Sequence, residues 1–197
     1  RVIKEEAALS VSSDGYQIAG ECYDQVILAT GAWLGQILEP LGYQVDVRPQ
    51  KGQLRDYQLD LVTDDYPVVM PEGELDIIPF QNGKISMGAT HENEMGFDLT
   101  VDQALLNQME IEALAYYPEL AQAEVIGERV GTRAYTSDFS PFWGVVPDQA
   151  GLYVASGLGS SGLTTGPLIG WHLAQLVVGG NLRLDPADYP VEQYVKK

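Results

Sequence analysis

Apolar residues fall along the chain in short runs typical of strands and in two longer stretches typical of helices. Residues 26–29 are a continuous apolar run of the kind that is buried on both faces of a sheet, and residues 152–155 form another short apolar strand. Residues 102–116 place apolar side chains on one side of a helix, and residues 162–178 form a second long helix. The outer thirds of the chain therefore predict buried strands that alternate with helices.

Hairpin signals dominate the rest of the pattern. The pair Asn82-Gly83 is the strongest of them, and residues 7–11 and 16–18 flank a second turn that contains Asp14-Gly15. Further strand-like segments are expected at 44–48, 52–59, 68–70, 75–79, 84–88 and 125–135. The pattern as a whole predicts a sheet-and-helix scaffold interrupted by a mainly antiparallel insertion, which is an α+β fold.

The net charge of the chain limits the kinds of partner that it is expected to bind. The 197 residues include 11 Lys and Arg against 28 Asp and Glu, which gives a net charge of −17. Such a surface repels phosphate backbones and anionic lipids, so we expect no nucleic-acid partner. An anionic ligand would need a local cation to hold it.

Other features of the sequence exclude whole classes of site. Cys22 is the single cysteine and the histidines, His91 and His172, lie far apart, so neither a disulfide framework nor a metal site is expected. No apolar run approaches the ~18 residues that span a bilayer, and no signal peptide opens the chain. We therefore expect no transmembrane segment and a cytoplasmic location, and a homo-oligomer is compatible with the sequence.

A glycine motif lies between the last predicted strand and helix. Residues 157–162 match G-x-G-x-x-G, but the second strand of a dinucleotide-binding unit is missing, because Asp185 lies at the acidic position and Pro186 follows it. The motif still leaves backbone N–H groups open at a helix start, where an anionic group is stabilised. A glycine-rich turn chosen for close packing explains the same residues equally well.

An ordered set of segments resembles the D-amino-acid oxidase-like family of flavoenzymes, which includes glycine oxidases, sarcosine oxidases and D-amino-acid dehydrogenases. The matching pieces are 26–33 (VILATGAW), 49–53 (PQKGQ), 78–79 (IP), Gly83, 87–90 (MGAT), 131–133 (GTR), Asp138, Pro141, Gly144, 155–162 and 166–167. The resemblance implies FAD-dependent oxidation of an amine or amino acid, with a hydride passing from the substrate carbon to flavin N5. It also implies that this chain is the C-terminal half of such an enzyme, and a fragment of this kind is expected to be inactive alone.

The resemblance also divides the chain into lobes. Residues 1–43 and 145–197 would belong to the FAD-binding lobe, and residues 44–144 would form a substrate-binding lobe with a mixed, largely antiparallel sheet. Two alternatives remain open. One is a non-catalytic acidic binding or assembly domain of the same fold, and the other is an acidic α+β binding domain whose glycine turn only packs.

Cofactor-binding residues follow from the same resemblance. Ala8 matches a position near the adenine end of FAD, and Gly31 would let the chain pass close to the cofactor. One stretch matches the backbone that lies against the flavin ring, where N–H groups stabilise the charge of the reduced ring, and it comprises Leu158, Gly159, Ser160, Ser161, Gly162, Leu163 and Thr164. Lys51 matches a basic residue near the flavin in some members, and an exposed lysine is the alternative. No other catalytic side chain is expected.

Substrate-binding residues are expected in the middle of the chain. Arg133 matches the arginine that clamps the substrate carboxylate, and the alternative is an ordinary ion pair. Asp76 and His91 stand at two substrate-facing positions where glycine oxidase has other residues, and a surface location is the alternative for each. An aspartate near a carboxylate-binding arginine leads us to expect a substrate with an additional cationic or polar group, rather than a simple glycine-like one.

Overall fold

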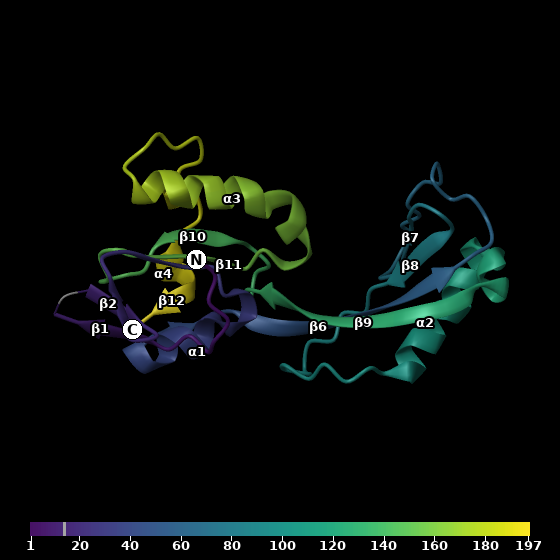
Figure 1. Ribbon diagram of the computed structural model, residues 1–197, viewed down its shortest axis with the longest axis horizontal. Coiled ribbons are helices and arrows are strands. Elements are labelled where there is room, and N and C mark those ends of the chain that lie inside the picture. Colours follow the sequence, from purple (N-terminus) through teal and green to yellow (C-terminus); the bar gives the residue numbers. More distant parts are fainter. Residues whose placement is uncertain (14) are drawn as a thin grey trace. The chain divides into compact units, whose positions relative to one another are not determined.

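The computed structural model describes residues 1–13 and 15–197, which form two compact units. The first unit combines Arg1–Pro49 with Arg133–Lys197, and the second unit is Gln50–Thr132. Both boundaries lie inside strands, in β6 (Arg48–Gln58) and β9 (Glu124–Tyr135), which are labelled in Figure 1. The second unit is thus shorter than the lobe of residues 44–144 expected from the sequence.

A three-stranded sheet forms the centre of the first unit, in the order β10-β11-β4. Strand β11 (Leu152–Ser156) pairs in parallel with β4 (Val26–Leu28) and antiparallel with β10 (Phe142–Val145). Both β4 and β11 lie where the sequence predicts short apolar strands. Strand β10 is not among the predicted strands, because it is stabilised by pairing with β11, a contact that forms only in the tertiary fold.

Helices cover both faces of this sheet. Helix α3 (Gly162–Val177) packs on the face that carries Trp143 and Tyr153, while α1 (Leu34–Leu38) and α4 (Val191–Tyr194) pack on the opposite face. Ile27 on β4 is 46% exposed, so the expectation that the run 26–29 is buried on both faces is wrong. Strand β4 lies at the edge of the sheet, and this leaves one of its faces open.

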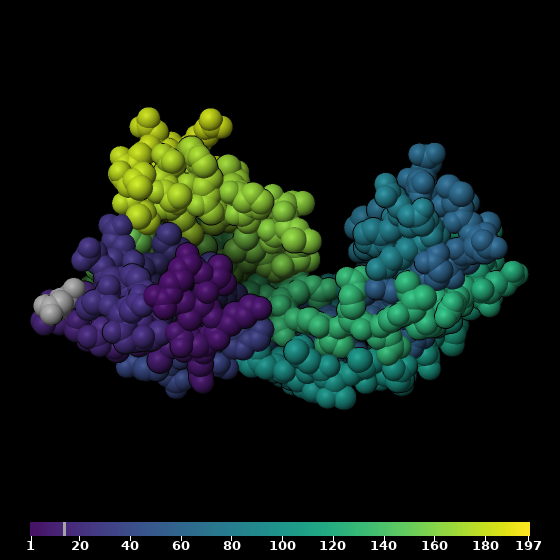
Figure 2. Space-filling model, in the orientation of Figure 1, coloured from purple at the N-terminus to yellow at the C-terminus, as the bar shows by residue number. Residues whose placement is uncertain are grey.

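Smaller elements complete the first unit. The predicted hairpin is present as β1 (Leu9–Ser12) and β2 (Gly15–Ile18), and Asp14 in its turn lies outside the described residues. Residues 1–8, the darkest purple in Figure 2, are exposed. The remaining elements are β3 (Glu21–Tyr23), η1 (Gly31–Trp33), η2 (Glu39–Leu41), β5 (Gln44–Val45), η4 (Gly159–Ser161), η5 (Pro186–Asp188) and β12 (Val195–Lys196).

The second unit is a four-stranded sheet in the order β7-β8-β6-β9 with one long helix. Strands β7 (Asp76–Pro79) and β8 (Lys84–Gly88) form the hairpin that Asn82-Gly83 predicts. Helix α2 (Gln103–Tyr116) begins where the Asp102 side chain accepts hydrogen bonds from Ala104 and Leu105 N–H, and η3 (Pro118–Gln122) follows it. The expected strand 68–70 is reduced to one bridge, Val69 to Ile77.

The two faces of this sheet differ in composition. Tyr57, Ile85 and Met87 point toward α2 and form a core with Met109 and Ala113 of that helix. Because side chains alternate along strands, the residues between them point to the opposite face. Within the second unit, no described helix packs against that opposite face, which we call the open face.

Two findings limit the kinds of site that the fold offers. Among residues 1–13 and 15–197, no helix is long and apolar enough to cross a bilayer. The same residues contain no group of three or more metal-ligating side chains that could hold an ion.

Candidate functional site

The carboxyl ends of two parallel strands meet in the first unit. The register pairs Leu152 with Val26 and Val154 with Leu28, so β11 and β4 end at the same edge of the sheet. Beyond these ends, the Ser156 hydroxyl donates a hydrogen bond to the Gly31 carbonyl over 3.0 Å. Ligands of open α/β sheets bind at such an edge. The structure thus brings Gly31 next to the strand that leads into the glycine motif.

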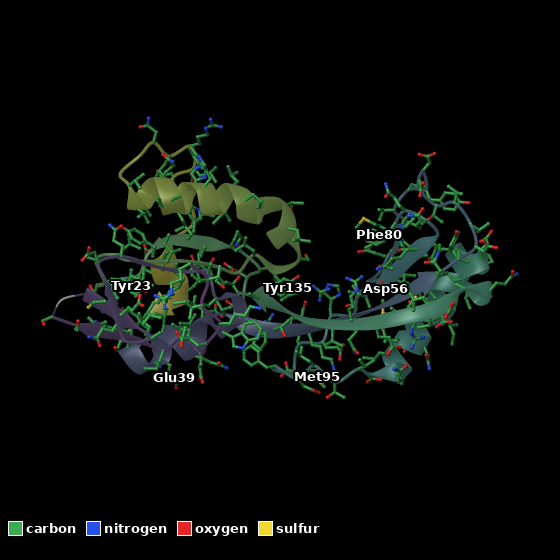
Figure 3. The ribbon with its side chains drawn as sticks, viewed as in Figure 1. Tyr23, Glu39, Asp56, Phe80, Met95 and Tyr135 are labelled. Atoms are coloured by element: carbon green, nitrogen blue, oxygen red, sulfur yellow. The ribbon has the colours of Figure 1, made fainter. Side chains whose placement is uncertain are left out.

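The glycine motif is required for packing. Gly157 and Gly159 have φ values of +75° and +53°, which side chains rarely adopt. A Cβ atom would lie 2.8 Å from the Ser140 carbonyl oxygen at Gly157 and 2.7 Å from the Tyr135 ring at Gly159. Tyr135 is labelled in Figure 3. Close packing therefore explains why glycine occupies these two positions.

The start of α3 presents uncapped backbone groups. Ser161 precedes the helix and makes no side-chain capping bond, while its carbonyl accepts hydrogen bonds from the hydroxyls of Thr164 and Thr165. Leu163 in the first turn is 95% exposed. Near the same sheet edge, the buried Thr30 hydroxyl has no hydrogen-bond partner among the described residues. A polar or anionic group could therefore bind along this edge.

Ala8 lies apart from this edge in the sheet topology. It is exposed and directly precedes β1, which belongs to a separate three-stranded sheet. The expected contact of Ala8 with the adenine end of the cofactor remains a prediction.

His172 is a structural histidine. It is fully buried in α3, its Nδ1 lies 2.8 Å from the Leu168 carbonyl, and its Nε2 accepts hydrogen bonds from the N–H groups of Arg183 and Leu184. Its neighbour Trp171 is 40% exposed and lies under the Arg183 guanidinium. Trp171 is therefore only partly buried.

Lys51 is buried in the second unit, which corrects the expectation of an exposed lysine. Its side chain is 1% exposed, and its ammonium group donates to the Thr100 carbonyl and lies 3.7 Å from Glu92 and 4.0 Å from Asp98. These contacts attach the segment before α2 to strand β6. A role for Lys51 near the flavin remains a prediction.

His91 lines a small acidic pocket. Its Nδ1 atom lies 3.4 Å from a Glu74 carboxylate oxygen, and its side chain is 33% exposed. The pocket has a volume of about 280 Å³ and is lined by Glu74, Leu75, Thr90, His91, Glu92, Leu105, Gln108, Met109 and Glu112. Asp76 does not line this pocket. The two residues that the sequence assigns to one substrate site thus occupy different surfaces of the second unit.

Asp76 belongs to the open face. It pairs with Gly88, and two residues further along Ile78 pairs with Ser86, which in turn pairs with Asp56. Directly paired residues of antiparallel strands point to the same side. Asp76, Ser86 and Asp56 therefore share the open face.

A charged cluster occupies this face around Asp56, which is labelled in Figure 3. Arg129 of β9 donates to both carboxylate oxygens, from Nε over 3.0 Å and from Nη2 over 2.9 Å. The Ser86 hydroxyl also donates to Asp56, and Lys84 Nζ lies 3.4 Å from it. We call Asp56, Lys84, Ser86 and Arg129 the Asp56 cluster.

Electrostatics favour the ionised form of Asp56. Burial acts to raise the pKa of this carboxyl, but the hydrogen bonds from Arg129 and Ser86 and the charges of Arg129 and Lys84 outweigh it and hold the pKa below its ordinary value. Asp56 is only 6% exposed, whereas the Arg129 side chain is 55% exposed. The carboxylate therefore anchors a cation that reaches the surface.

A second network lies on the face covered by α2. Arg55 donates from Nε to Glu128, from Nη1 to Asn107 and Glu110, and from Nη2 to Gln103. Its side chain is 5% exposed. Every nitrogen of this guanidinium has a partner, so Arg55 joins β6, β9 and α2.

Arg133 lies four residues beyond Arg129 on β9, at the start of the segment that belongs to the first unit. It is partly buried. Because side chains alternate along a strand, residues four apart point to the same side. Its role as a carboxylate clamp remains a prediction.

Sequence reasoning missed both networks of β6. The signal that could have found them is the alternation of polar residues at Lys51, Gln53, Arg55 and Tyr57, in a strand whose intervening positions include Asp56. Because side chains alternate along a strand, residues at every second position share one face. The partners Glu110, Glu128 and Arg129 could not be identified, since they come from distant elements.

Comparisons with known proteins support the flavoenzyme resemblance. Residues 1–176 match the DAO family, described as FAD dependent oxidoreductase. The uncharacterized oxidoreductase YurR of Bacillus subtilis is 43% identical over 95% of this chain and 52% of its own length. Glycine oxidase of Pseudomonas aeruginosa is 35% identical over 84% of this chain and 45% of its own length.

The fold is shared with solved structures of the same family. Iminodiacetate oxidase from Chelativorans sp. BNC1 superposes with a TM-score of 0.89 at 35% identity, over 93% of this chain and 52% of that one. The chain thus spans about half the length of the relatives it matches. The α+β fold with a largely antiparallel sheet is confirmed, and the chain belongs to the DAO family of FAD-dependent oxidoreductases.

Proposed function

We propose that the intact gene product catalyses FAD-dependent oxidation of an amine or amino acid, in which the flavin accepts a hydride from a substrate carbon. The observation that supports this most directly is the edge where β4 and β11 end side by side, with uncapped amides at the start of α3. Membership of the DAO family and the similarity to a glycine oxidase and an iminodiacetate oxidase support the same class of reaction. We also propose a cytoplasmic location, and we expect the 197-residue chain alone to be inactive.

The residues at this edge are compatible with the flavin. Amides of residues 158–164, apart from the Ser161 N–H that donates to the Leu158 carbonyl, would lie against the polar side of the ring, where they would stabilise negative charge on it. Gly31 has open space where a Cβ would stand, and the Thr30 hydroxyl is buried without a partner. These features fit a cofactor with hydrogen-bonding oxygen atoms close to the backbone.

Arg133 would bind the substrate carboxylate through its two-pronged guanidinium. Asp76 would face the positive amine of the substrate, since it stands on the open face and its side chain makes no hydrogen bond or ion pair with the described residues. His91 is the third candidate, and its pocket beside Glu74 is a separate place where a polar substituent could bind. In this arrangement the protein binds and orients the substrate, and the flavin supplies the redox chemistry.

An anaerobic flavin titration tests the proposal. Intact gene product is mixed with D- and L-amino acids, N-methyl amines and imino acids, iminodiacetate among them, while its visible spectrum is recorded. Bleaching of the flavin bands by one of these classes is expected. Replacement of the clamp, Arg133→Met, should raise the concentration needed for bleaching roughly tenfold to a hundredfold, because a charge-assisted hydrogen bond is lost.

Arg183→Met is the matched control, because Arg183 contacts Trp171 outside the proposed site. It should leave the titration unchanged. Flavin bands that no compound bleaches would contradict the oxidation and favour a non-catalytic binding role. Absence of flavin bands after addition of FAD would contradict the cofactor assignment as well.

A further inference from the structure

We propose that Asp138 is a positioning residue that determines how strongly the protein binds reduced flavin relative to oxidised flavin. It acts through the turn of residues 136–140, which supports the backbone at the start of the glycine motif. This role rests on the proposed function, because it requires amides of residues 158–164 to lie against the flavin ring. All the residues involved belong to the first unit.

The Asp138 side chain holds the turn of residues 136–140 from within. Its Oδ1 atom accepts hydrogen bonds from the Thr136 hydroxyl and from the Ser140 N–H, both over 3.1 Å. The Thr136 hydroxyl also lies 2.8 Å from the Ser140 carbonyl oxygen, so it shares its proton between two acceptors across the turn. The hydrogen bond from the Ser140 N–H, together with those from side chains, holds the pKa of Asp138 below its ordinary value.

The C-terminal part of the chain contacts the other oxygen of Asp138. Its Oδ2 atom accepts hydrogen bonds from the Tyr194 hydroxyl over 2.9 Å and from the Gln193 side-chain amide over 3.1 Å. Tyr194 is 4% exposed, and its ring stacks on Phe142 with 4.8 Å between the ring centroids. Asp138 thus joins the turn to helix α4, which is packed in the core of the first unit.

Phe139 has a backbone conformation that its neighbours must enforce. Its φ is +61°, a left-handed value that bulky residues rarely adopt. The ring is 59% exposed and contacts the edge of Tyr135 and the Arg48 guanidinium. A strained conformation persists only where the surrounding structure restrains it. The hydrogen bonds of Asp138 on both sides of Phe139 supply that restraint.

The restrained turn packs directly against the glycine motif. A Cβ atom at Gly157 would lie 2.8 Å from the Ser140 carbonyl oxygen and 2.9 Å from the Thr136 methyl group. The ring of Tyr135, which precedes the turn, contacts Gly159 in the same way. A shift of the turn therefore displaces the backbone that follows Gly157. Because hydrogen bonds weaken steeply with distance and misalignment, such a shift weakens those that the amides of the motif would make to the flavin.

The amides distinguish the two redox forms by charge. Reduction gives the flavin ring negative charge, and N–H groups at a helix start stabilise a negative group more strongly than a neutral one. Donors that are held in place before the charge develops stabilise it most. A loosened turn therefore weakens the binding of reduced flavin more than that of oxidised flavin, which lowers the reduction potential.

Asp138→Ala in the intact gene product tests this role. The reduction potential of bound FAD is measured against reference dyes, and the Kd of oxidised FAD is measured by fluorescence. The ratio of the affinities for reduced and oxidised flavin should fall about tenfold, which lowers the potential by about 30 mV for a two-electron couple. A general loss of stability would weaken the binding of both forms equally and leave the potential unchanged, and this result would overturn the proposal.

Three single variants serve as comparisons. Asp138→Asn keeps an oxygen that accepts from Thr136 and Ser140, so it should retain most of the potential. Tyr194→Phe keeps the buried ring and removes one hydrogen bond to Asp138, so it should lower the potential less than Asp138→Ala does. Asp24→Ala is the matched control, because Asp24 is an exposed residue of the same unit whose side chain makes no hydrogen bond with the described residues. It should leave the potential unchanged.

A double variant separates the position of the turn from the charge of Asp138. Glycine adopts positive φ without strain, so Asp138→Ala combined with Phe139→Gly should keep the turn in place and recover about half of the lost potential. Phe139→Gly alone should have a potential close to that of the wild type. A negative charge that acted directly on the flavin would disfavour reduction, and its removal would raise the potential. A raised potential in Asp138→Ala would therefore overturn the proposal.

Amide hydrogen exchange of the flavin-free gene product keeps this role separate from the proposed oxidation. Residues 157–168 include the Ser161 N–H, which donates to the Leu158 carbonyl, and the first N–H groups bonded within α3. These groups should exchange roughly tenfold faster in Asp138→Ala, and at the wild-type rate in Asp24→Ala. Unchanged exchange in a protein whose flavin is bleached by a substrate would overturn the role of Asp138 alone. A wild type that binds no FAD would contradict the proposed function together with it.

Discussion

Arg55 and Asp56 are neighbours on β6, yet the networks around them have different consequences. Arg55 points toward α2, is 5% exposed, and has a partner for each of its nitrogens. Asp56 points to the open face and holds Arg129, whose Nη1 reaches the surface without a partner among the described residues. One network is closed within the protein, and the other ends in free donors.

The difference shows how to distinguish a structural arginine from a binding one. Both make ion pairs, so the presence of a salt bridge does not separate them. The accounting of N–H groups does, because a guanidinium with all its nitrogens paired has nothing to offer a ligand. By this criterion Arg55 supports the fold, whereas Arg129 keeps two N–H groups that have no partner among the described residues.

The largest expected effect is on the closed network. Arg55→Ala leaves Glu110 and Glu128 without their cation beneath α2, and loss of one partner of a buried ion pair costs about 3–5 kcal/mol. Urea denaturation of the intact gene product should show a decrease of this size in the free energy of unfolding. Arg129→Ala is the comparison, and a loss as large as that of Arg55→Ala would contradict the distinction between the two networks.

A smaller loss is expected when the anchor of the other network is removed. Asp56→Asn keeps the shape of the side chain but loses the charge that binds Arg129 and Lys84, which should reduce stability by about 1–3 kcal/mol. It should also release the Arg129 guanidinium from its buried partner. The control is Asp60→Asn, at an exposed position just after the end of β6, and this change should not alter stability.

The pH dependence of that loss gives an independent check. The pKa of Asp56 is lowered in the folded protein, so its ionisation stabilises the fold above the unfolded pKa of about 3.9. This contribution is lost as the pH falls through the lower folded value. The difference in unfolding free energy between wild type and Asp56→Asn should therefore be constant near neutral pH and shrink below about pH 4. A difference that grows on acidification would show that the carboxylate is not stabilised as described.

The smallest stability effect concerns the start of the helix that covers the closed network. Asp102→Ala removes the acceptor for the Ala104 and Leu105 N–H groups and should cost about 1 kcal/mol. Glu112→Ala, at an exposed position within α2, should have almost no effect. Thermal denaturation of the two variants side by side measures the difference, and equal midpoints would argue against a stabilising cap.

Local signals in the sequence predicted the elements with local causes. The β7–β8 hairpin follows from Asn82-Gly83, and α2 follows from the apolar side of residues 102–116. Strand β10 and the exposed Ile27 were not predicted, because both depend on which strand lies at which position in the sheet. Arg129 was missed for the same reason, since its partner Asp56 is 73 residues away.

Some features of the proposed site were likewise predicted from the sequence, and others depend on the tertiary structure. The glycine motif was found from its spacing, whereas the need of Gly157 and Gly159 for close packing became visible only with their neighbours in place. The sequence could not predict that Asp76 lies apart from the His91 pocket. This separation depends on which face of β7 carries Asp76 and on where the loop with His91 lies in the fold.

Gln50–Thr132 is one continuous segment, and it enters and leaves the first unit on β6 and β9, which are neighbours in one sheet. A segment whose two ends are adjacent can be exchanged for another without rethreading the rest of the chain. The open face, with Asp76 and the Asp56 cluster, is carried by that segment, whereas the amides at the start of α3 are not. Exchange of this segment would therefore replace the open face and leave the residues of the glycine motif in place.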